Sequence, residues 1–155
     1  MRAGKKVSLG LAVLVAGIQF VRPAKNLSVA PPGRDDLATH YAAPPEVRRL
    51  LATACYDCHS NNTRYPWYAE VQPVGWFLAG HVRDGKRELN FAEFAAYSTH
   101  TQAKKLEAIS DNVSARDMPL KSYTWIHRDA VLTDAQVKTL SDWADALHDQ
   151  LEPEK

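Results

Sequence analysis

Apolar residues recur at helical spacing along most of this chain, and no segment shows the regular alternation expected of a β-strand. In residues 44–59 one helix face carries Val47, Leu50, Leu51, Ala54 and Cys58. A second apolar face near the end of the chain consists of Val137, Leu140, Ala144, Leu147 and Leu151. Between these segments the pattern predicts helices over residues 73–85, 90–97 and 101–113. The body of the protein is therefore predicted to be all-α.

Residues with known capping preferences mark the expected helix ends. Prolines 44 and 45 suit the first turn of the first helix. Gly85 is expected to end the helix that begins at Pro73. Asn90 with Glu93, and Thr133, are placed as amino-terminal caps.

The amino-terminal 25 residues differ from the rest in charge. They contain basic residues and no acidic ones, whereas the remainder has more acidic than basic residues. A mildly acidic body argues against nucleic acid as a partner, because phosphate binding requires a basic face. The apolar run at 7–21 would span ~22 Å as a helix, shorter than the ~30 Å bilayer core but suited to a signal sequence or short anchor.

Three regions are thus predicted: a signal or membrane anchor (1–25), a proline-rich linker (26–43) and a folded domain (44–152). The anchor is expected to stay on the chain and to hold the body at the periplasmic side of the inner membrane. The alternative is cleavage near Ala30, after Ser-Val-Ala, which would leave a periplasmic protein.

Both cysteines of the chain lie in the stretch CYDCHS, residues 55–60. A structural zinc site needs four ligands, and no second cysteine pair or suitably spaced histidine pair is present. A thioredoxin-like dithiol sits beside a βαβ unit, which the pattern lacks. A disulfide across so short a loop would constrain the unfolded chain little.

Cys-x-x-Cys-His is the attachment pattern of c-type haem. On a helix Cys55, Cys58 and His59 occupy positions i, i+3 and i+4, so they share one face. Two thiols can then reach the two vinyl groups of one porphyrin while His59 coordinates iron. Export supports this interpretation, because covalent haem attachment takes place outside the bacterial cytoplasm. One haem c, attached through Cys55 and Cys58, is the expected cofactor.

Met118, in the loop RDMPL, is the only methionine of the body and the expected sixth iron ligand. The order of a CxxCH helix, intermediate helices, a Met-Pro loop and a closing helix resembles class I cytochromes c. That resemblance implies that the first and last helices pack together, with Val47, Leu50 and Leu51 against Leu140, Trp143, Ala144 and Leu147. His81 is the alternative sixth ligand.

A closer resemblance rests on CHSNNTRYPWY, on the later Pro-x-x-Trp and His-Val-x-x-Gly segments, and on the Met-Pro loop. Together these resemble the bacterial haem-binding domain family over residues 44–147, and IQFVRP at 18–23 resembles its anchor. The resemblance implies haem c binding. We expect aromatic residues to wall the haem, namely Tyr65, Trp67, Trp76 and Phe77. The alternatives are core packing for Trp76 and Phe77, and partial exposure near a docking surface for Trp67. The carbonyl of Pro73, or alternatively Pro66, is expected to accept a hydrogen bond from His59.

The function favoured by the sequence is that of a non-enzymatic electron-transfer module with His/Met-ligated iron and a redox partner protein. A haem-based sensor or a structural haem subunit of a membrane complex is the main alternative. A peroxidase-like enzyme is less favoured, because it needs an open iron position that Met118 would fill.

Overall fold

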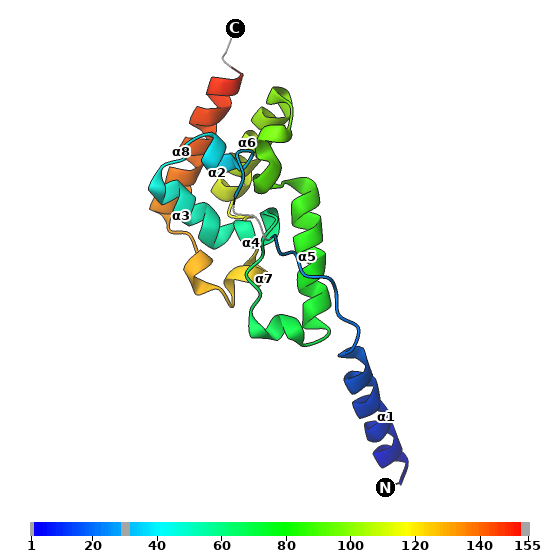
Figure 1. Ribbon diagram of the computed structural model, residues 1–155. Helices are drawn as coiled ribbons and strands as arrows, with labels where there is room; N and C mark the ends of the chain where they lie inside the picture. Colours follow the sequence, from blue (N-terminus) through cyan, green and yellow to red (C-terminus); the bar gives the residue numbers. More distant parts are fainter. Residues whose placement is uncertain (1, 29–31, 153–155) are drawn as a thin grey trace.

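A computed structural model describes residues 2–28 and 32–152, and every regular element within them is helical (Figure 1). This agrees with the all-α prediction. The α-helices are α1 (Arg2–Ile18), α2 (Leu37–His40), α3 (Pro45–Ala54), α4 (Tyr56–His59), α5 (Val74–Glu88), α6 (Thr99–Ser114), α7 (Lys121–Thr124) and α8 (Asp134–Leu151). Three 3₁₀ turns, η1 (Trp67–Glu70), η2 (Phe91–Ala96) and η3 (Arg128–Ala130), connect them.

The core lies between α3, α6 and α8. As expected, α3 packs against α8, and the apolar faces of both helices are buried there; they contribute Val47, Leu50 and Leu51, and Leu140, Ala144 and Leu147. Each fully buried leucine contributes roughly 1.5–3 kcal/mol relative to an exposed one. The most extensive interface of α8 is, however, with α6, so the closing helix is supported mainly by α6 rather than by α3.

The helix predicted over residues 44–59 is interrupted within the cysteine motif. α3 ends at Ala54, and Cys55 leaves helical geometry with φ −125° and ψ −43°. The short helix α4 then begins at Tyr56. The carbonyl of Cys55 accepts hydrogen bonds from the amides of Cys58 (3.2 Å) and His59 (3.0 Å). Cys55, Cys58 and His59 thus keep the expected i, i+3, i+4 relation, but the turn that holds them is α4 and not a continuation of α3.

Gly85 does not end the helix in which it lies. α5 continues to Glu88, and a Cβ atom built at Gly85 would lie 2.8 Å from the carbonyl oxygen of Cys58. The glycine is therefore required by the close approach of α5 to the motif turn, which is a packing reason rather than a termination signal.

Two predicted caps are present, and the second is more complete than expected. The Asn90 side chain accepts from the Ala92 amide, but Glu93 does not close a capping box, because it accepts from the Asn61 side chain at 2.8 Å. Thr133 and Gln136 form a full capping box at the start of α8. The methionine-containing loop, residues 116–132, for which the pattern predicts no helix, also contains regular structure, namely α7 and η3.

The segment predicted as a linker, residues 26–43, is in large part folded into the domain. Leu37, Ala38 and Ala43 are buried in the core, and α2 is capped by the side chain of Asp36. Asp36 also accepts a hydrogen bond from the Tyr56 hydroxyl at 3.0 Å. Proline content alone was misleading here, because buried apolar residues follow the prolines. Ala30, the possible cleavage site, lies outside the described residues.

The amino-terminal element extends away from the body as α1, a helix of 17 residues (Figure 1). Its apolar side chains are exposed, among them Val7, Leu9, Leu11, Val13 and Leu14. Among the described residues, no helix combines the length and the apolar character needed to cross a bilayer.

Candidate cofactor site

Two adjoining cavities, of about 250 and 330 Å³, lie between the motif turn and the loop that carries Met118. They share the lining residues Ala54, Cys55, His59, Glu88, Met118 and Pro119. The first cavity extends towards α5, and the second extends towards the apolar face of α6 at Ile109 and Val113. Their lining is mostly apolar, as is usual for cofactor sites.

The two cysteine side chains are half-buried at this cavity, and both thiols are free. Burial raises the pKa of Cys55 to about 12, with a smaller contribution from Cys58. Burial also raises the pKa of Cys58 to about 11, with a contribution from the negative charge of Asp57. Both side chains are therefore protonated thiols at neutral pH.

His59 is oriented by the backbone. Its Nδ1 donates a hydrogen bond to the carbonyl of Leu89 at 3.1 Å, which leaves Nε2 as the nitrogen available to a metal. Burial lowers the pKa of His59, so the ring is neutral, as ligation requires.

The prediction that Pro73 accepts this hydrogen bond was wrong. The Pro73 carbonyl accepts from the Phe77 amide inside the first turn of α5, and the alternative, Pro66, accepts from Ala69. Leu89 was missed because any residue type offers a backbone carbonyl, so the sequence carries no signal for it.

Both candidate sixth ligands reach the first cavity. Met118 follows α6, where its amide donates to the carbonyl of Asn112 at 3.1 Å, and its side chain lines both cavities. His81 lines the first cavity only, with its Nδ1 3.0 Å from the Phe77 carbonyl. Met118, which lines both cavities, is thus more centrally placed in the candidate site than His81, which lines one.

The aromatic residues expected to wall the cofactor lie elsewhere. Neither cavity is lined by Tyr65, Trp67, Trp76 or Phe77. Tyr65 accepts a hydrogen bond from the Asn26 amide, and Trp76 donates to the Val21 carbonyl at 2.7 Å. Trp67 is 80% exposed, in line with the alternative expectation for it.

The amino-terminal strap, defined here as residues 19–26, explains this arrangement because it contacts the loop after the motif through residues that line neither cavity. Gln19 exchanges two hydrogen bonds with Gln72, and both Arg22 and Lys25 pair with Glu70. The aromatic loop after the motif thus packs against this segment rather than against the cofactor cavity.

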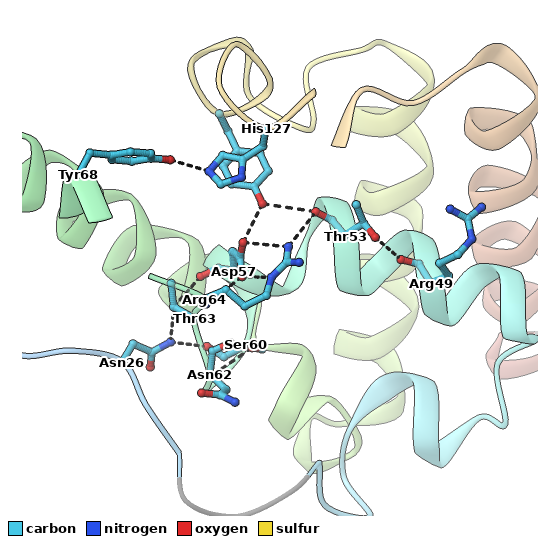
Figure 2. A network of polar contacts seen from close by, with 11 residues as sticks. Asn26, Arg49, Thr53, Asp57, Ser60, Asn62, Thr63, Arg64, Tyr68 and His127 are labelled. Carbon is cyan, nitrogen blue, oxygen red and sulfur yellow. Dashed lines mark hydrogen bonds and ion pairs between the residues drawn. The ribbon is translucent and has the colours of Figure 1, made fainter. Parts of the chain in front are cut away.

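A polar network around Asp57 was not predicted (Figure 2). Asp57, between the two cysteines, is buried and accepts from Arg64 and from the Tyr123 hydroxyl. Tyr123 lines the first cavity, and burial raises its pKa well above its usual value, with a further contribution from Asp57. The sequence contained one signal for this network. Asp57 lies inside the motif, and a carboxylate buried there needs a cation or hydrogen-bond donors.

The donors around these cavities fit an iron porphyrin. Two thiols suit thioether formation with vinyl groups, and the free Nε2 of His59 suits iron. The thioether of Met118 provides a soft donor from a different segment. The apolar lining suits the porphyrin faces.

The profile of a family described as a haem-binding domain matches residues 13–146. The matched range includes the strap, the cysteine motif, Met118 and most of α8. No solved structure and no protein of curated function matches the chain.

Proposed function

Because this chain belongs to the haem-binding domain family, we propose that it is an exported electron-transfer protein carrying one haem c, attached through Cys55 and Cys58. The observation that supports this most strongly is the shared cavity. Cys55, Cys58, His59 and Met118 come from two segments far apart in sequence and line one space.

We propose His59 and Met118 as the axial ligands. Haem bound there would supply a one-electron couple, and Met/His ligation raises the potential of such a couple relative to bis-histidine ligation. The Leu89 carbonyl holds the His59 ring in one tautomer and orientation. With both axial positions filled by protein, the site has no open position for substrate, so it favours electron transfer over peroxidase-like chemistry.

The redox partner is proposed to be a protein that docks beside the methionine-containing loop. Trp125 and Ile126 are 74% and 55% exposed, and they lie two and three residues after the cavity-lining Tyr123. Exposed aromatic side chains beside a site are common in protein interfaces.

We further propose that residues 1–25 attach the protein to the periplasmic side of the inner membrane and are retained. Support comes from Asn26, which forms hydrogen bonds to the loop after the motif through both its backbone and its side chain. Its side-chain amide donates to the Ser60 carbonyl (2.8 Å) and to Thr63 Oγ1 (2.9 Å), and its Oδ1 accepts from Lys86. Cleavage near Ala30 would remove these contacts. Intact mass measurement of the protein recovered from membranes tests retention.

The axial assignment is tested by the spectrum of the ferric protein. A sulfur-ligated ferric haem has a weak long-wavelength charge-transfer band, which Met118→Ala should abolish and His81→Ala should leave in place. Loss of the band only in His81→Ala would contradict the assignment. Rapid carbon monoxide binding by the reduced wild-type protein would instead favour the sensor or the peroxidase-like alternative.

A further inference from the structure

A buried carboxylate lies inside the attachment motif itself. Asp57 separates the two cysteines of CYDCH, and the residue is only 6% exposed. Removing a charge from water is costly unless paired groups compensate. The partners of Asp57 therefore indicate what this buried charge holds in place.

Arg64 satisfies part of the carboxylate from the loop that follows the motif (Figure 2). Its amide and Nε donate to Oδ1 of Asp57 at 3.0 and 3.1 Å, and its Nη2 donates to Oδ2 at 3.1 Å. This fork is local, because only a few residues separate the two side chains. It leaves Oδ2 able to accept one more hydrogen bond.

That further hydrogen bond comes from the methionine-containing loop. The Tyr123 hydroxyl donates to Oδ2 of Asp57 at 2.8 Å across 66 residues of sequence. The Tyr123 ring also stacks on His127, with ring centroids 4.2 Å apart and an interplanar angle of 12°. His127 Nε2 is in turn hydrogen-bonded to the Tyr68 hydroxyl at 2.6 Å.

The segment between Met118 and His127 is therefore fixed at two points. At its start, the amide of Met118 is fixed to the end of α6 through the Asn112 carbonyl. Five residues later, Tyr123 is fixed to the motif turn through Asp57. Pro119 and Leu120, which line the first cavity, lie between these two fixed points.

We infer that Asp57 and Tyr123 are positioning residues that hold the Met118 loop against the CxxCH turn and so keep the methionine sulfur in place as a ligand. This inference rests on the proposed function, because it assumes that Met118 is the sixth ligand. The Asp57–Tyr123 hydrogen bond then links the covalent attachment to the axial ligand. Without it, Met118 should leave the iron more readily.

The test is an imidazole titration of the ferric protein, since imidazole competes with Met118 for iron. Tyr123→Phe removes the hydroxyl and keeps the ring that stacks on His127. We expect a roughly ten- to hundredfold rise in apparent imidazole affinity, the shift expected when a hydrogen bond to a charged group is lost. Tyr65→Phe removes a hydroxyl away from the cavity and should leave the affinity unchanged.

Asp57→Asn provides a second variant that keeps an acceptor for Tyr123, so its effect should be smaller and in the same direction. The double variant should bind imidazole no more tightly than Tyr123→Phe alone, because both changes act on the same hydrogen bond. All variants should carry the same amount of covalent haem, which separates positioning from attachment.

Met118→Ala distinguishes the two proposals. If it leaves imidazole affinity unchanged, Met118 is not the ligand, and both the axial assignment and the positioning role fail. If Met118→Ala raises the affinity while Tyr123→Phe and Asp57→Asn stay at the wild-type value, only the positioning role is overturned.

Discussion

The motif turn has two sides that differ in chemistry. On one side, α5, α6 and the methionine-containing loop surround cavities lined mainly by apolar groups and possible iron ligands. On the other side, the amino-terminal strap binds the loop through hydrogen bonds and ion pairs, and large aromatic residues are exposed nearby. The first side is suited to a cofactor. The second side holds in place the loop that follows the motif turn.

The difference shows that aromatic content does not locate a cofactor. The segment RYPWY is the most aromatic of the chain, yet none of its residues lines either cavity. Tyr65 contacts the strap, and Tyr68 contacts His127. The cavity side is built by residues that are individually ordinary, such as Gly85, Leu89 and Ile109. Changes on the strap side should therefore lower stability without removing the cofactor, whereas changes on the cavity side should affect cofactor attachment or the packing around the motif turn.

The largest effect is expected on the cavity side. Replacing Cys55 and Cys58 together by serine should abolish covalent haem, because no other cysteine is present. In-gel haem staining after denaturation measures this. Haem that survives denaturation in the double variant would show that attachment uses another group.

Gly85 tests the contact between α5 and the motif turn. Gly85→Ala should lower the free energy of unfolding by up to ~3 kcal/mol, because its Cβ would meet the Cys58 backbone. Gly80→Ala is the matched control in the same helix, where the nearest atom is the end of the Arg83 side chain at 3.9 Å. The control should be neutral or stabilising by roughly 0.5–1 kcal/mol. Equal results in denaturant unfolding would contradict the packing role of Gly85.

On the strap side, Asn26→Ala should lower the free energy of unfolding by about 1–2 kcal/mol, through loss of side-chain hydrogen bonds to Ser60, Thr63 and Lys86. Covalent haem content should stay at the wild-type level. Asn62→Ala, at an exposed position of the same loop, is the control and should have little effect. A loss of haem in Asn26→Ala would show that the two sides are not separable.

The smallest effect concerns pH on the strap side. A hydrogen bond and the positive charge of Lys25, with a smaller contribution from Arg22, lower the pKa of Glu70 below 4.5. The stabilisation is therefore fully present above pH 4.5 and is lost as pH falls through the lowered pKa. The stability difference between wild type and Glu70→Gln should shrink in the same pH range. A difference that stays constant with pH would contradict this ion pairing.

Periodicity predicted the helical class, and the dense motif predicted that Cys55, Cys58 and His59 gather at one site. The α3–α8 contact was instead implied by the resemblance to class I cytochromes c, which also supported the choice of Met118. Other features depend on tertiary contacts that leave no local pattern. Leu89 acts through its backbone, Gly85 through the absence of a side chain, and Asp57 through partners that are distant in sequence. Residues 19–25 of the strap lay within the predicted anchor and Asn26 within the predicted linker, because none of them shows its hydrogen-bond or ion-pair partners in the sequence.

Ligation of iron by Met118 is tested most directly by proton–carbon-13 correlation NMR of the reduced protein with labelled methionine methyl groups. The chain has only two methionines, Met1 and Met118, so assignment needs one variant. Ligation of iron by Met118 predicts one methyl proton signal shifted far upfield by the ring current of haem and absent in Met118→Ala. Two methyl signals at ordinary positions, in protein that carries covalent haem, would contradict His59/Met118 ligation.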